Sequence, residues 1–246
     1  MPHYVLDTHM HTIASGHAYS TIAEMIVEAQ RKELQLIAIT EHGPNLRGSV
    51  TEVYFRNFKV IPRQYGDLEL MMGIEADLMD AQGTLCIDET IQKNLDYIIA
   101  SLHPLVTKPM SKAENTSAYL GAVHNPYVCT LGHMDDGKYE CDYEAVIREA
   151  ALTGTLIELN SSSLHPLSSR KNSRENMTEM MRLCEKYGAR VVLDSDAHIC
   201  YDIANFARAD ALMKECGFPE ELVVNTSVEK FKESIQKKRL YFDIVK

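Results

Sequence analysis

Short runs of apolar and β-branched residues alternate along the chain with longer segments that have helical spacing. This alternation is typical of strands joined by crossover helices, and it differs from the pattern of consecutive hairpins. It predicts seven strands, over residues 4–7, 36–40, 70–75, 97–102, 128–132, 156–159 and 190–193.

Between these strands, apolar residues recur at roughly i, i+3, i+4 and i+7, which predicts amphipathic helices. The expected helices cover residues 21–33, 52–63, 111–124, 142–152, 172–187 and 203–216, and a last one over 228–237 follows Ser227 as its N-cap. No linker rich in Pro, Gly or Ser divides the sequence. We therefore expect a single α/β domain over residues 1–246, and regular alternation at this length favours a barrel over an open sheet.

The overall charge narrows the range of partners. Thirty-five acidic and twenty-five basic residues among 246 give a formal charge of −10, which argues against broad binding to nucleic acid or to anionic membranes. The longest apolar runs are far shorter than the roughly 20 residues of a membrane-spanning helix, and the first residues lack the pattern of a secretory signal. We therefore expect a cytoplasmic protein, with its six scattered cysteines reduced.

Histidines and carboxylates follow the ends of most predicted strands. Asp7, His9 and His11 alternate just beyond the first strand, so the side chains of His9 and His11 point to the same side of an extended backbone. The other strand ends carry His42, Glu75, His103, His133, Asp196 and His198. Because the carboxyl ends of all strands meet around one mouth of a strand-helix barrel, these side chains are expected to converge there.

Imidazoles and carboxylates without thiolates indicate a site for zinc, manganese or iron. So many ligands exceed the needs of one tetrahedral ion, which implies two or three ions, with Glu75 as the natural bridge between a pair. Neighbouring ions of this kind can activate a shared water for phosphoryl transfer. His3, His124 and His165 do not occupy comparable strand ends, so we leave them outside the predicted site.

The motifs together resemble the PHP (polymerase and histidinol phosphatase) superfamily. The resemblance rests on Asp7-Thr-His9-Met-His11, Thr40-Glu-His42-Gly, Gly73-Ile-Glu75, His103, Gly132-His133 and Asp196-Ala-His198. The segments His17-Ala-Tyr-Ser20, Leu159-Asn-Ser-Ser-Ser163 and Ser168-Ser-Arg170-Lys171 are similar to its stand-alone phosphatases of the YcdX type. The resemblance covers nearly the whole chain and implies a distorted (βα)7 TIM-like barrel.

The resemblance also implies how the ions are held. It implies a trinuclear cluster, usually of zinc, with a first ion on His9, His11, Glu75 and Asp196, a second on Glu75, His103 and His133, and a third on His17, His42 and His198. A hydroxide bridging the first two ions would then attack phosphorus. We expect Glu75 and Asp196 to be catalytic through the metal ions, and Arg170, with Lys171, to contact the phosphate, since an arginine fork matches two phosphate oxygens.

Two alternatives to a phosphatase stay open on the sequence alone. An amidohydrolase barrel also begins with a strand-end His-x-His and ends with an aspartate, but it does not need a third ion. A metal-binding regulatory protein with little turnover would carry the same ligands, because ligand residues establish binding capacity and not rate. The expected partner is a small phosphorylated substrate, whose identity the sequence does not give, while nucleic acid and membrane are excluded and homo-oligomerisation stays open.

Overall fold

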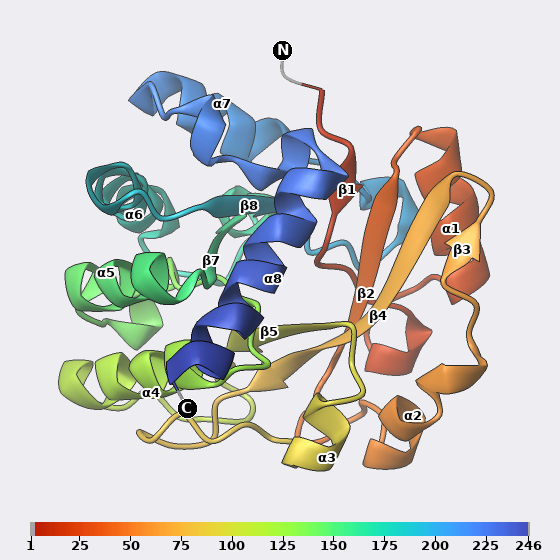
Figure 1. Ribbon diagram of the computed structural model, residues 1–246, viewed down its shortest axis with the longest axis horizontal. Coiled ribbons are helices and arrows are strands. Elements are labelled where there is room, and N and C mark those ends of the chain that lie inside the picture. Colours follow the sequence, from red (N-terminus) through yellow and green to blue (C-terminus); the bar gives the residue numbers. More distant parts are fainter. Residues whose placement is uncertain (1–2, 246) are drawn as a thin grey trace.

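The computed structural model describes residues 3–245, in which seven parallel strands curve into a nearly closed barrel (Figure 1). The strands are β1 (Leu6–Asp7), β2 (Leu36–His42), β4 (Leu68–Asp77), β5 (Tyr97–Ser101), β6 (Thr130–Leu131), β7 (Leu156–Asn160) and β8 (Val191–Asp194). They pair in chain order, and every pair is parallel. All seven predicted strands are confirmed, and the short β3 (Gln64–Tyr65), antiparallel to β4, was not predicted.

Helices follow most of the strands and cover the outside of the barrel. They are α1 (Ile22–Arg31), α2 (Glu52–Arg56), α3 (Glu89–Gln92), α4 (Lys112–His124), α5 (Tyr143–Thr153), α6 (Ser173–Tyr187), α7 (Ala207–Cys216) and α8 (Val228–Val245). Helices α4, α5, α6 and α7 stack side by side along one flank, as Figure 1 shows. With alternating strands and helices around one barrel, the expected distorted (βα)7 fold is confirmed.

Some predicted helix boundaries are wrong. The helix expected over residues 52–63 ends at Arg56 and is followed only by a 3-10 turn, Phe58–Val60, because Pro62 disfavours helical geometry at Ile61. The helix expected from residue 203 begins at Ala207, since Ala204 has a left-handed φ of 56°. At the other end of the chain, α8 continues beyond residue 237 to Val245, and α3 was not predicted.

The seam between β8 and β1 is closed mainly by a side chain and not by a strand ladder. The Asn225 amide nitrogen donates to the carbonyl oxygens of Leu6, at 3.0 Å, and Leu193, at 2.7 Å, while its amide oxygen accepts the Leu193 N–H. Further along the seam, the backbone N–H and hydroxyl of Thr8 both donate to Asp194. These bonds complete the ring of strands and fix β1 beside β8.

The interior of the barrel is apolar at the amino ends of the strands. Leu6, Leu36, Tyr97, Leu156 and Val192 are fully buried there, and α8 covers them with an apolar face formed by Val228, Phe231 and Ile235. Helix α8 crosses in front of the strands in Figure 1. The amino end of the barrel is therefore sealed, which leaves the carboxyl end as the entrance.

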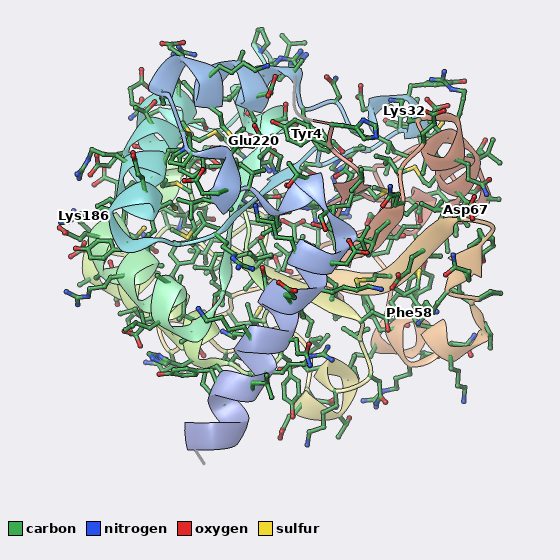
Figure 2. All side chains as sticks on the ribbon, turned by 45° about the horizontal axis from the view of Figure 1, so that its top comes forward. Tyr4, Lys32, Phe58, Asp67, Lys186 and Glu220 are labelled. Atoms are coloured by element: carbon green, nitrogen blue, oxygen red, sulfur yellow. The ribbon has the colours of Figure 1, made fainter. Side chains whose placement is uncertain are left out.

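Buried apolar side chains form a second, larger core between the sheet and the helices around it. Phe58 belongs to this buried layer, whereas Lys186 lies at the surface of α6 and pairs with Glu144 (Figure 2). Within residues 3–245, no helix combines the length and the apolar character that crossing a membrane requires. All six cysteines lie in this range and are free, as expected.

One charged residue is buried in the packing of α8. Lys238 is only 1% exposed, and its ammonium donates to the Val123 carbonyl and, at 2.6 Å, to the Thr155 hydroxyl. Burial lowers the pKa of Lys238 from 10.5 to about 7. The folded protein therefore holds this amine with fewer protons than the unfolded chain does above neutral pH.

The contribution of Lys238 to stability should for this reason rise with pH above about 7. Between that value and 10.5 the unfolded chain binds a proton that the folded protein does not, so the Lys238 contribution to the free energy of unfolding grows by about 1 kcal/mol per pH unit. Urea unfolding of the wild type and of Lys238→Met at pH 7, 8 and 9 measures this. The difference between the two proteins should change in favour of the wild type as pH rises, and a constant difference would contradict the assignment.

Candidate metal centre

The six histidines and two acids predicted at strand ends, together with His17, which only the family resemblance implied, meet at the open end of the barrel. Glu75, at the end of β4, lies in the middle of the group and is 1% exposed. Its Oε1 lies 2.7 Å from His133 Nε2 and 3.1 Å from His103 Nε2. Its Oε2 lies 3.0 Å from His42 Nδ1 and 3.2 Å from His9 Nε2. The two oxygens of one carboxylate thus face different sets of imidazoles.

Six of the imidazoles form three pairs whose ring nitrogens face each other. The Nε2–Nε2 distances are 3.1 Å for His9 and His11, 3.2 Å for His103 and His133, and 3.0 Å for His17 and His198. Two nitrogens bound to one tetrahedral zinc ion, with Zn–N bonds near 2.0–2.1 Å, would lie about 3.3 Å apart. The three separations therefore suit three shared cations.

The other ring nitrogens have partners that fix which nitrogen carries the hydrogen. His9 Nδ1 donates to Glu158 at 2.5 Å, and His103 Nδ1 donates to Asp77 at 2.8 Å. His17 Nδ1 donates to the Ser15 carbonyl oxygen at 3.1 Å. When these rings are neutral, as a metal ligand must be, their Nε2 atoms carry lone pairs that face the Nε2 atoms of the paired histidines. A cation between them is the natural way to offset their repulsion.

Two polar atoms at the centre of the group lack hydrogen-bond partners within the described part of the chain. They are His42 Nδ1 and Glu75 Oε2, both buried and 3.0 Å apart. A buried nitrogen or oxygen without a hydrogen bond is costly, and groups of this chemistry are ordinary metal ligands. The residues present therefore fit a metal ion.

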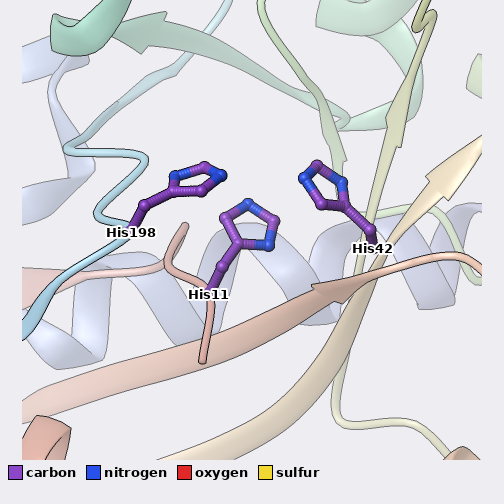
Figure 3. Close-up of side chains that lie close together, drawn as sticks. All are labelled: His11, His42 and His198. Carbon is purple, nitrogen blue, oxygen red and sulfur yellow. The ribbon is translucent and has the colours of Figure 1, made fainter. Parts of the chain in front are cut away.

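The rings of His11, His42 and His198 converge from three separate segments of chain (Figure 3). Their ligand atoms lie within 4.8 Å of one another, as do those of two further groups, His9 with His11 and Asp196, and His42 with Glu75 and His103. His11 and His42 each belong to two groups. The candidate ligands therefore form one continuous cluster, and three neighbouring ions could be held in it.

Two candidate ligands adopt left-handed backbone conformations that ordinary residues rarely use. Asp196 has φ 54° and His133 has φ 25°. Such strain persists where the surrounding structure holds it, and it concentrates at functional sites. The Asp196 carboxylate also receives the Arg170 guanidinium at 2.9 Å and the Asn160 amide at 3.2 Å, which fix one oxygen and leave Oδ1 facing His11 at 3.4 Å.

The ionisation of the cluster without metal suits cation binding. Burial opposes ionisation of Glu75, but His103 and His9 outweigh it and hold its pKa well below the usual value. Burial lowers the pKa of His42 to about 4 and that of His11 well below 6.5. Burial also disfavours charge on His103, yet Glu75 outweighs it and raises the pKa of this imidazole to about 10. Metal uptake would have to displace such protons, which makes it dependent on pH.

Sequence reasoning missed Glu158, which supports the cluster from β7. Its carboxylate is fully buried and accepts from His9 Nδ1 and from the backbone N–H of His133, each at 2.5 Å. It thereby orients one candidate ligand on each side of Glu75 and holds His133 in its strained conformation. The signal in the sequence was a charged residue inside an otherwise apolar strand, but its partners lie 149 and 25 positions away.

The remaining predicted residues divide into those near the cluster and those away from it. Arg170 lies at the cluster and donates to Asp196 and to the Ser163 hydroxyl, each at 2.9 Å. The neighbouring Lys171 has an exposed side chain. Of the histidines left out of the prediction, His124 pairs with Glu149 on the surface, and His165 lies on the exposed loop after β7.

A parallel strand-helix barrel that gathers imidazoles and carboxylates at its carboxyl end defines a metal-binding barrel enzyme. The PHP domain family matches residues 7–162, and the chain belongs to this family. A probable phosphatase of Caldanaerobacter subterraneus subsp. tengcongensis is 46% identical over 96% of this chain and 92% of its own length. A probable phosphatase of Acetivibrio thermocellus is 41% identical over 96% and 97%. The expected family and enzyme class, a metal-dependent phosphatase, are confirmed, and the amidohydrolase alternative loses support.

Solved structures share the fold at low identity. The histidinol phosphate phosphatase of Lactococcus lactis, in complex with zinc, L-histidinol and phosphate, is similar with a TM-score of 0.57 at 16% identity over 88% of this chain and 95% of that one. A chain of an archaeal ribonuclease P bound to mature tRNA has a TM-score of 0.56 at 16% identity over 97% and 92%. At such identities the likeness establishes the fold alone.

Replacing Glu158 by glutamine should weaken metal binding. The amide keeps the shape of the side chain but accepts fewer hydrogen bonds, so it cannot orient both His9 and His133 as the carboxylate does. Loss of such a supporting group lowers metal affinity about 10–100-fold. Zinc affinity is measured by competition with a chromophoric chelator, with the exposed Glu185→Gln on α6 as the matched control. Equal affinities in the two variants would refute this role.

Proposed function

We propose that the protein hydrolyses small phosphomonoesters with a cluster of three metal ions bound at the carboxyl end of the barrel. The observation that carries the proposal is the three pairs of facing Nε2 atoms, 3.0–3.2 Å apart, around the two oxygens of Glu75. One pair for each ion is the number that a trinuclear cluster requires. The family membership and the names of the curated relatives support the same chemistry.

The proposed ligand sets follow these pairs. His9, His11, Glu75 and Asp196 would hold one ion, Glu75 with His103 and His133 a second, and His17, His42 and His198 a third. Zinc suits this mixture of imidazole nitrogen and carboxylate oxygen, and manganese or iron would also be accepted. The zinc in the structurally similar histidinol phosphate phosphatase supports the choice of zinc.

Bound ions would supply Lewis acidity, which would make water a better nucleophile at neutral pH and offset negative charge on the phosphoryl oxygens. The side chains of this protein do the positioning. Glu75 keeps two sets of imidazoles at a fixed separation. Arg170 places its guanidinium beside Asp196, where its N–H groups can donate two hydrogen bonds to the phosphate. The 17% exposure of the Arg170 side chain leaves it partly open to such a ligand.

The substrate is proposed only as a small phosphomonoester. Histidinol phosphate is one candidate, because a structurally similar enzyme is a histidinol phosphate phosphatase. With a formal charge of −10, the protein as a whole repels anions, so an anionic substrate must be held by local cations. The metal ions and Arg170 provide these cations at the mouth of the barrel.

The proposal predicts phosphatase activity that depends on metal. Exhaustive treatment with a chelator should lower hydrolysis of p-nitrophenyl phosphate by about two orders of magnitude, and zinc or manganese should restore it. Glu75→Gln should remain inactive after metal is added back, whereas the exposed Glu185→Gln should behave as the wild type does. Hydrolysis of cyclic amides but not of phosphate esters would replace the proposal by an amidohydrolase, and tight metal binding without turnover of either would replace it by a metal-binding protein.

A further inference from the structure

A recess of about 120 Å³ adjoins the metal centre between the loops that follow β7 and β8. It is lined by Ser162, His165, Ser195, Asp196, Asp202, Asn205 and Arg208. The volume corresponds to roughly four water molecules at about 30 Å³ each, which suffices for a carboxylate or a phosphate group. Apart from Asp196, none of these residues belongs to the proposed metal centre.

We infer that this recess binds a second anionic group of the substrate, either a carboxylate or a phosphate, while the scissile phosphate occupies the metal centre. The inference rests on the proposed function and specifies its substrate class. The two places share Asp196, which faces His11 with one oxygen and also lines the recess. Two anionic groups of one small molecule can therefore occupy the metal centre and the recess at the same time.

Arg208 is the main cation of the recess. It lies in the first turn of α7 and is partly buried. Among the described side chains, no carboxylate forms an ion pair with its guanidinium, although Asp202 lines the same recess. A partly buried arginine without an ion-pair partner offers a planar set of N–H donors to a carboxylate or phosphate.

His165 adds a donor whose orientation the structure fixes. Its Nδ1 accepts the backbone N–H of Leu167 at 3.0 Å, so in the neutral ring the hydrogen is on Nε2. Together with the Ser162 hydroxyl and the Asn205 amide, the recess thus offers N–H and O–H donors from four side chains, counting Arg208. Hydrogen-bond donors therefore predominate in the recess, as they do in sites that bind anions.

The carboxylates of Asp196 and Asp202 also line the recess, but they do not prevent it from binding an anion. Asp196 is already neutralised by Arg170, which donates to it at 2.9 Å, and it would be a metal ligand as well. Asp202 is exposed, and its Oδ1 accepts from the Asn205 amide at 3.4 Å. Water screens such an exposed charge more strongly than it screens the partly buried guanidinium of Arg208.

The test compares matched substrates on the metal-loaded enzyme. Glycerol 3-phosphate and 3-phosphoglycerate differ by a carboxylate, and fructose 6-phosphate and fructose 1,6-bisphosphate differ by a second phosphate. We expect the wild type to prefer the doubly anionic member of at least one pair in kcat/KM by tenfold or more. This exceeds the twofold gain that two scissile groups would give, and the pair concerned identifies the anion.

Arg208→Gln should lower that preference at least tenfold, and His165→Gln should lower it in the same direction by less. Arg182→Gln serves as the matched control, because this exposed arginine on α6 pairs with Glu179 away from the recess. Circular dichroism and thermal unfolding check that each variant folds. A wild type that hydrolyses all four substrates without preference, or a preference that Arg208→Gln leaves unchanged, overturns this inference while the proposed phosphatase stands. Absence of turnover of every substrate overturns both.

Discussion

Imidazole nitrogens crowd together in a buried space at the carboxyl end of the barrel. Three pairs of Nε2 atoms lie 3.0–3.2 Å apart, and the Glu75 carboxylate separates two of these pairs. Without metal, protons relieve part of the repulsion between these nitrogens, since Glu75 raises the pKa of His103 to about 10, and burial removes the water that would otherwise relieve the rest. The surrounding fold therefore holds the candidate ligands in positions that suit bound cations.

The barrel holds this arrangement by dividing its interior into layers. Helix α8 seals an apolar layer at the amino end, where its buried Phe231 packs against Tyr97. Above it lies a layer of buried polar groups. Glu158 accepts from His9 and His133, and Asp194 accepts from Thr8, which directly precedes His9. The candidate metal centre forms the third layer, at the end of the barrel opposite α8. The rigid lower layers explain how strained conformations at His133 and Asp196 persist.

The periodicity of the sequence predicted the strands well, because most of them contain a short apolar run with polar residues at its end. The cluster could also be predicted, since parallel strands bring their carboxyl ends together and thus bring His11 near His198. Glu158 and Asn225 were missed for a different reason. Their partners are distant in sequence, and a buried carboxylate or amide gives no periodic signal that names the group it will bond. The recess at Arg208 likewise depends on how two loops pack.

We expect three cations to complete the cluster, and anomalous X-ray scattering from crystals of the zinc-loaded protein would locate them. Difference maps recorded above and below the zinc absorption edge should contain three peaks, one between the facing nitrogens of each pair: His9 with His11, His103 with His133, and His17 with His198. Zinc peaks confined to surface histidines such as His124, or a full occupancy at only one of the three positions, would contradict the account.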